Sequence, residues 1–146
     1  MKIRHLVHSC LLVEVAGRRL LIDPGAFSTE AVRGLGADVL AGIDAVLVTH
    51  QHPDHLDRGL LEEVLGHAAD AEVLAEPETA ALLSEPADGA EAVGPGRLHA
   101  LGAGDTHELG AVAGQAAVRI DAVGGQHAII HPDIPRVGNA RVVITA

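Results

Sequence analysis

The sequence contains almost no aromatic side chains. Phe27 is the only one among 146 residues, and tryptophan and tyrosine are absent. Proteins that bind single-stranded nucleic acid stack its bases on aromatic rings, so this class of protein is disfavoured. Basic residues are also few, because 10 Lys and Arg stand against 20 Asp and Glu and the formal net charge is −10. Without a basic run to neutralise phosphates, we expect no nucleic-acid partner.

Cysteine and long apolar runs are equally scarce. Cys10 is the only cysteine, which makes an intramolecular disulfide impossible and gives no reason to propose an oxidising compartment. The apolar stretch near the N-terminus is broken by His8 and Glu14, so it does not resemble a signal peptide or a membrane span. We therefore expect a cytoplasmic protein that makes no membrane contacts. Cys10 lies in an apolar segment and is interpreted as a small buried hydrophobe.

What the sequence does contain is the composition of a globular domain. Hydrophobic residues make up 48% and charged residues 21% of the chain, and 146 residues are enough to bury a sizeable core. We expect a single domain over residues 1–146. Three short apolar runs, at 3–7, 10–15 and 19–23, predict a meander of strands that ends at the turn Asp23-Pro24-Gly25.

Strands and helices then alternate. The valine-rich run 45–49 predicts a buried strand. Asp57 is placed to cap a helix that runs to about residue 69, and Pro77 to open a short helix through Leu83. One helical turn is expected between residues 29 and 35, and further strands at 72–76, 98–101, 115–123 and 141–145.

The strand at 45–49 leads directly into His50-Gln51-His52-Pro53-Asp54-His55. Four of these six side chains can bind divalent metals. In an extended segment His50 and His52 point to the same side and can share one ion, whereas Asp54 and His55 follow a bend at Pro53 and point elsewhere. Two neighbouring sites are predicted. Two ions about 3.5–4 Å apart can hold a hydroxide between them and supply it as a nucleophile.

Residues 48–57, Val-Thr-His-Gln-His-Pro-Asp-His-Leu-Asp, closely resemble the signature of the metallo-β-lactamase-fold hydrolases. Upstream, residues 20–25 resemble the family's strand that ends in aspartate, and His8-Ser9-Cys10 resembles the opening of its UlaG-like branch. Downstream, residues 123–127 resemble the third motif, which ends in a histidine. The resemblance implies an α/β fold, namely the N-terminal portion of a metallo-β-lactamase αβ/βα sandwich with a mixed sheet and flanking helices.

The resemblance also implies roles for individual residues. His50, His52 and His127 would bind a first ion, and Asp54 and His55 would contribute to a second; Asp54 would also be the catalytic residue that contacts the hydrolytic water. Asp23 would lie behind them and accept a hydrogen bond from a ligand histidine or a bound water. The alternative for Asp23 is a simple turn former before Pro24, and the alternative for His127 is a loop histidine after two glycines. Three histidines favour zinc, as one or two ions, with manganese and iron as alternatives.

The sequence departs from the family pattern at its end. Family members continue after the strand resembling residues 141–145 into a second half that supplies a bridging aspartate, a last histidine and outer helices, and this sequence has no counterpart. Gly104-Asp105-Thr106 imitates the aspartate motif but precedes His127, so we interpret it as a turn before a strand. We therefore expect an incomplete second site and an uncovered apolar sheet surface, which favours a homo-oligomer.

Two functions stay open. The first is a metal-dependent hydrolase in which metal-bound hydroxide attacks an ester, phosphodiester, lactone or amide in a small-molecule substrate. The alternative is a non-catalytic metal-binding or self-associating half-domain.

The other histidines receive ordinary interpretations. For His8 the alternatives are a side chain that faces the site and one that hydrogen-bonds backbone at a strand end, and the second is expected because it is commoner. His131 and Asp133 echo the UlaG-like branch and either line the substrate mouth or cap a surface loop. His5, His67, His99 and His107 have no partner motif and are interpreted as surface or structural residues.

Overall fold

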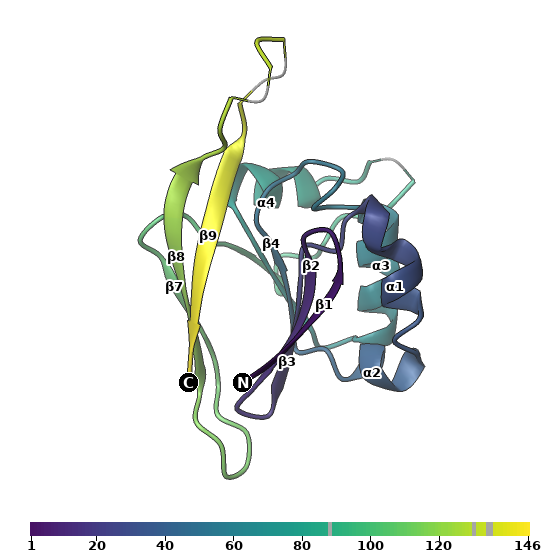
Figure 1. Cartoon of the computed structure of the whole chain (residues 1–146), viewed down its shortest axis with the longest axis vertical. Coiled ribbons are helices and arrows are strands. Elements are labelled where there is room, and N and C mark those ends of the chain that lie inside the picture. Colours follow the sequence, from purple (N-terminus) through teal and green to yellow (C-terminus); the bar gives the residue numbers. More distant parts are fainter. Residues whose placement is uncertain (88, 130, 134–135) are drawn as a thin grey trace.

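Two β-sheets pack face to face, and helices cover the outer face of the first sheet (Figure 1). The computed structural model describes residues 1–87, 89–129, 131–133 and 136–146. Within these residues the first sheet has six strands in the order β1-β2-β3-β4-β5-β6, and the second has three in the order β7-β8-β9. No described helix combines the length and the hydropathy that a membrane crossing needs.

The N-terminal strands form the predicted antiparallel meander. The strands are β1 (Lys2–Val7), β2 (Cys10–Val15) and β3 (Arg18–Ile22). Cys10 is fully buried, as expected, and burial raises the pKa of its thiol to about 11. The helical turn expected between residues 29 and 35 is present as α1 (Thr29–Arg33), and two further short segments, η1 (Ala26–Ser28) and α2 (Ala37–Ala41), flank it without having been predicted. Gly34 and Gly36 separate α1 from α2, since glycine favours helix ends over helix interiors.

The middle of the chain is a parallel α/β segment. It contains β4 (Ala45–Val48), α3 (Arg58–His67), β5 (Glu72–Ala75), α4 (Pro77–Leu83) and β6 (Leu98–Ala100). The predicted caps are present: Asp57 accepts a hydrogen bond from the backbone N–H of Leu60 at 2.9 Å, and Pro77 opens α4. These local signals placed both helix starts correctly.

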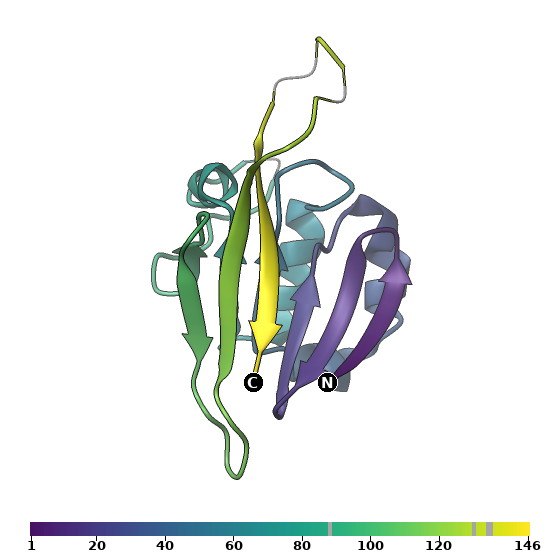
Figure 2. The ribbon, with the colours of Figure 1, turned by 60° about the vertical axis from the view of Figure 1, so that its left-hand side comes forward.

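The second sheet comprises β7 (Thr106–Leu109), β8 (Val118–Gln126) and β9 (Gly138–Thr145). The turn expected at residues 104–106 is confirmed as far as Asp105, since β7 begins at Thr106. Within the described strands β9 pairs with β8 alone. Figure 2 shows β9 (yellow) as a long strand of the β8–β9 hairpin.

Successive side chains along each strand of the first sheet point to opposite faces, and this produces two apolar layers. Leu21 and Val46 face the helices, whereas Leu20, Leu47 and Leu74 face the second sheet. The outer face of the second sheet carries no helix among the described residues, as Figure 1 shows. The described chain is therefore arranged as helices, sheet and sheet, with two buried layers between them.

Candidate metal centre

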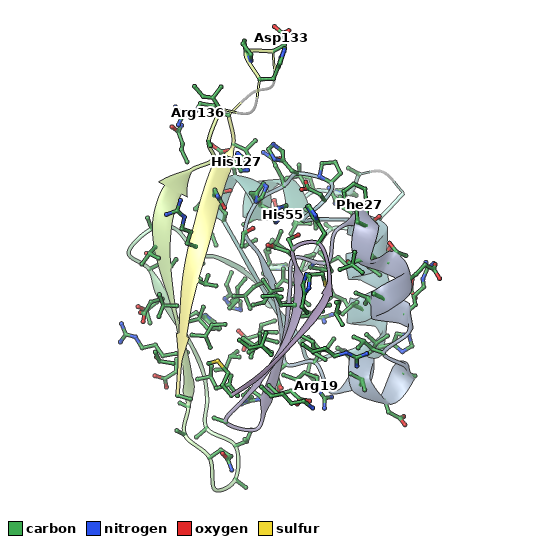
Figure 3. All side chains as sticks on the ribbon, viewed as in Figure 1. Arg19, Phe27, His55, His127, Asp133 and Arg136 are labelled. Atoms are coloured by element: carbon green, nitrogen blue, oxygen red, sulfur yellow. The ribbon has the colours of Figure 1, made fainter. Side chains whose placement is uncertain are left out.

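The candidate metal centre lies at the end of the sheets where β4 and β8 finish. His50 follows β4 by two residues, and His127 directly follows β8. Figure 3 shows His55 and His127 at this same end, on the side from which the β8–β9 hairpin projects. Loops at the carboxyl ends of parallel strands open on one edge of a sheet, which is why residues far apart in the sequence can meet there.

The first triad consists of His50, His52 and His127. The ring centroids lie 4.8 Å apart for His50 and His52, 4.6 Å for His50 and His127, and 4.9 Å for His52 and His127. One nitrogen from each ring lies within 4.8 Å of the other two. The structure thus brings together the three side chains that the sequence grouped, and their role as metal ligands stays a prediction.

His50 places an unpaired nitrogen in this triad. The residue is only 2% exposed, and its buried Nε2 has no hydrogen-bond partner in the described part of the chain. The Thr49 hydroxyl donates to Asp23 at 2.9 Å, so at 3.1 Å it can only accept from His50 Nδ1. The ring proton therefore sits on Nδ1, and Nε2 presents a lone pair, the form in which imidazole binds a metal.

The same tautomer is set in His127. Its Nδ1 lies 2.9 Å from the carbonyl oxygen of Ala128, and a carbonyl can only accept. Nδ1 must carry the proton, which leaves the lone pair on Nε2. Two of the three rings are thus held in a ligating form by neighbours outside the triad.

The second triad consists of His8, Asp54 and His55. Oδ2 of Asp54 lies 2.9 Å from His8 Nε2 and 3.5 Å from His55 Nε2. The second triad adjoins the first, because the ring centroids of His50 and His55 are 3.9 Å apart. Each triad offers three ligand atoms that lie within 4.8 Å of one another, so the arrangement can hold two ions side by side.

Asp23 connects the centre to the sheet behind it. Its carboxylate accepts the backbone N–H of Thr49 at 2.8 Å and lies 2.8 Å from His55 Nδ1. The carboxylate is 4% exposed, and it directs Nε2 of His55 towards Asp54 by holding the proton on Nδ1. The expected hydrogen bond between Asp23 and a ligand candidate is present; its effect on a bound metal stays a prediction.

The electrostatics favour the neutral form of His50 and His52. Burial, followed by the charges of His55, His127 and His52, lowers the pKa of His50 to about 4. Burial and then His127 also lower the pKa of His52. Neutral imidazoles are the form that coordinates metal, so at neutral pH no proton has to be displaced from either ring.

The pKa values of His55 and Asp54 shift in the directions expected for an ion pair. Burial alone lowers the pKa of His55, but its hydrogen bond to Asp23 and the charges of Asp23 and Asp54 outweigh burial and raise that pKa. Burial raises the pKa of Asp54, but the hydrogen bond from His8 and the nearby histidines outweigh it, so the pKa of this carboxyl lies below its ordinary value. Asp54 is therefore ionised at neutral pH.

The loop that carries four ligand candidates is clamped by the turn after β3. Ala26 donates its N–H to the carbonyl of Pro53 at 2.8 Å, and Asp57 donates to the carbonyl of Pro24 at 3.0 Å. Between them, Gly25 packs so closely on the backbone of Asp54 that a Cβ would overlap the Asp54 carbonyl. Glycine is required at this close approach.

Two ligand-bearing turns also adopt a conformation that L-residues seldom take. His8 has φ 55° and Asp23 has φ 48°, in the left-handed region. Such conformations persist where surrounding contacts hold them. Here the hydrogen bonds of His8 to Asp54 and of Asp23 to Thr49 supply those contacts.

His127 is positioned by the base of the β8–β9 hairpin. Its N–H donates to the carbonyl of Val137 at 2.9 Å, and Ala140 donates to the carbonyl of Thr49 at 2.9 Å. Gly138 donates to the Glu78 carboxylate of α4 at 2.8 Å. These bonds hold the end of the second sheet against the loop that contains His50.

Several sequence interpretations are corrected here. His8 was expected to bond backbone through its side chain, but it faces Asp54 and joins the second triad. Its likeness to the UlaG-like opening was the available signal. His99 and His107 are not isolated, since both converge on Glu72. His131 and Asp133 are exposed and pair with each other, and Figure 3 shows Asp133 near the tip of the hairpin, away from His55.

The donor chemistry fits a divalent metal. The two triads together offer five imidazoles and one carboxylate, a set that zinc and neighbouring transition metals accept. The unpaired Nε2 of His50 points to the same conclusion, because a buried nitrogen without a partner is costly unless something binds it. The specific metal follows from none of these contacts.

Comparisons with known sequences agree with this geometry. Residues 2–142 match the family described as the beta-lactamase superfamily domain. The chain is 40% identical over 144 residues to protein Rv0786c of Mycobacterium tuberculosis, covering 99% of this chain and 57% of that protein. It is 33% identical over 129 residues to a UPF0173 metal-dependent hydrolase of Rhizobium johnstonii, covering 84% of this chain and 52% of the relative. The chain thus spans little more than half the length of these relatives.

Solved structures show the same fold. Igni18, a metallo hydrolase of the archaeon Ignicoccus hospitalis, superposes with a TM-score of 0.62 at 21% identity, covering 98% of this chain and 55% of that one. The metallo-β-lactamase-fold protein YhfI of Bacillus subtilis superposes with a TM-score of 0.54 at 23% identity, covering 94% and 49%. The expected fold class is therefore confirmed.

Proposed function

Because the chain belongs to the beta-lactamase superfamily domain family, we propose that it hydrolyses a small-molecule ester, phosphodiester, lactone or amide at the candidate metal centre. The membership confirms the resemblance seen at residues 48–57. The observation that carries the proposal is the pair of adjacent triads, with the buried Nε2 of His50 left unpaired among them. Two neighbouring divalent sites are an arrangement that suits hydrolysis.

We assign different roles to the residues of the two triads. His50, His52 and His127 would hold a first ion, and His8, Asp54 and His55 would hold a second. A bound divalent ion polarises the substrate and lowers the pKa of a water molecule. Asp54 would orient the attacking water, because its ionised carboxylate accepts a hydrogen bond.

Zinc is the metal that we propose, because imidazole nitrogen is its common protein ligand. Manganese and iron are the alternatives to be compared. Thr49 and Asp23 favour ligation of a metal through Nε2, since they hold the ring proton on Nδ1 of His50 and of His55, respectively.

The test is a comparison of the metal-loaded chain with the same chain treated with a chelator. We expect hydrolysis of at least one member of a panel containing a p-nitrophenyl ester, a bis-nitrophenyl phosphodiester, an acyl lactone and an anilide, and we expect the chelator to abolish it. His67→Ala is the matched control, because His67 is exposed at the end of α3, outside both triads.

The panel also distinguishes the enzyme from the alternative function, a non-catalytic half-domain. Bound metal without hydrolysis of any panel member contradicts the enzyme and favours the non-catalytic metal-binding half-domain. Loss of metal in His52→Ala together with unchanged hydrolysis would place the reaction elsewhere. A light-scattering measurement on the same samples tests the expected homo-oligomer, which is a separate proposal.

A further inference from the structure

A second group of metal-binding side chains lies between the two sheets. Glu72 begins β5, His99 is the middle residue of β6, and His107 is on β7. We call Glu72, His99 and His107 the inter-sheet triad. None of them belongs to the candidate metal centre, and this inference does not depend on the proposed function.

Strand register explains why these side chains meet. Leu20, Ala45 and Glu72 are aligned across β3, β4 and β5, and the first two face the second sheet. Glu72 therefore faces the second sheet as well. His99 is paired with Leu74, two residues beyond Glu72 on the same face.

His107 approaches from the other sheet. It is paired with Ile120 of β8, a fully buried residue of the layer between the sheets. The triad thus takes one side chain from each of three strands and bridges both sheets.

The three side chains converge on one point. Oε2 of Glu72 lies 3.1 Å from His99 Nε2 and 2.7 Å from His107 Nε2. The two imidazole centroids are 4.8 Å apart. Ligands of one zinc ion lie about 2.0–2.2 Å from it, and hence about 3.4 Å from one another in a tetrahedron. The three ligand atoms of the triad lie within 4.8 Å of one another, which is close to that spacing.

The two nitrogens are also unsatisfied. Nε2 of His99 and Nε2 of His107 are both buried, and neither makes a hydrogen bond to any described residue, although Glu72 Oε2 is close to each. Buried polar atoms without a partner are costly. A cation that accepts a lone pair from each nitrogen and from the carboxylate removes that cost at all three atoms.

We propose that Glu72, His99 and His107 bind a divalent transition-metal ion of the zinc class, which joins β5 and β6 of the first sheet to β7 of the second. Two imidazoles and one carboxylate form a donor set that zinc uses in proteins. The side chains of Glu72, His99 and His107 are 34%, 36% and 19% exposed, so the triad lies near the edge of the layer between the sheets. The ion stabilises the contact between the sheets.

The experiment isolates this site from the candidate metal centre. The complete 146-residue chain carrying His52→Gln, His55→Gln and His127→Gln serves as the parent, since these substitutions disable both triads of the candidate metal centre at partly exposed positions. We expect the parent still to retain about one zinc per chain after dialysis. We expect zinc at about 100 times its Kd to raise the melting temperature by roughly 5–10 °C.

Adding His107→Gln, or separately His99→Gln, should remove that zinc and the zinc-dependent rise, while the melting temperature in chelator stays close to that of the parent. His67→Gln is the matched control and should change neither quantity. A third variant, Glu72→Gln, should weaken zinc binding by at least about tenfold, because the ligand charge is lost. The proposal is overturned if the parent shows no zinc-dependent stabilisation, or if the rise survives both histidine substitutions.

Discussion

In the candidate metal centre, four of six ligand candidates come from the single loop His50–His55, whereas the inter-sheet triad takes one side chain from each of three strands. The loop is supported from behind: Asp23 and Thr49 hold the ring protons of His50 and His55 on Nδ1. No described side chain supports His99 or His107 in the same way.

This difference fits the two proposed roles, which are the orientation of reacting groups at the candidate metal centre and the cross-linking of two sheets at the inter-sheet triad. Orientation needs outer hydrogen bonds, because they set the tautomer and direction of each ligand. A cross-link needs only converging donor atoms on elements that are already rigid. The comparison therefore teaches that support around a ligand, more than the ligand itself, indicates chemistry.

The largest effect should come from removing a ligand of the first triad. His52→Ala should lower zinc affinity by more than about 100-fold and abolish hydrolysis, because only two of the three imidazoles remain. Metal analysis after dialysis gives the stoichiometry, with His67→Ala as the control. If zinc bound per chain at low micromolar concentration is the same in His52→Ala, the assignment of the first triad is wrong.

The metal-free centre should respond to acid through His50. The unfolded chain binds a proton on this residue near pH 6.5, but the folded chain binds it only near pH 4. Between these values the unfolded state holds more protons, so the free energy of unfolding should fall as the pH is lowered from 6.5 to 4, by at most about 3 kcal/mol.

His55 changes the free energy of unfolding in the opposite direction and over a higher pH range. Its raised pKa gives stability that is complete below pH 6.5 and is lost as the pH rises through that pKa. The two histidines together predict that the free energy of unfolding is highest near pH 6.5. Urea unfolding in chelator measures it, and His50→Gln should flatten the acid side; an equal slope in both chains contradicts the prediction.

The clamp on the ligand loop predicts an intermediate effect. Gly25→Ala should destabilise the chain by about 2 kcal/mol and weaken metal binding, because a Cβ there overlaps the Asp54 carbonyl. Gly66→Ala is the matched control: it lies in α3 with nothing within 4 Å of the added Cβ, and it should stabilise the chain by about 0.5–1 kcal/mol. Equal melting temperatures for the two variants would show that the contact at Gly25 is easily relieved.

The smallest effect should come from a residue behind the ligands. Asp23→Asn should weaken metal binding by about tenfold, since an amide has only one oxygen to accept bonds and no charge to attract the His55 proton. It should also bring the pKa of His55 down towards its ordinary value. NMR titration of the His55 ring measures this shift, which a purely structural role of Asp23 would leave unchanged.

Much of the fold could be predicted because its signals are local. Asp57 caps α3 and Pro77 opens α4, and both depend only on residues within one helical turn. The strand boundaries predicted for the second sheet are less accurate, because β8 begins at Val118 through pairing with β7, and β9 begins at Gly138 through pairing with β8. Neither boundary can be predicted from the residues of its own strand, since pairing with a neighbouring strand decides where a strand begins and ends.

By itself, the sequence determined that a buried strand delivers His50, His52, Asp54 and His55 into one loop, because alternation and the bend at Pro53 act between neighbours. Only the tertiary structure decided that His8 faces Asp54, and that Glu72, His99 and His107 converge. The physical reason is the same for both: these contacts depend on the register of several strands and on which face of each sheet packs against the other, and no single segment of the chain specifies that.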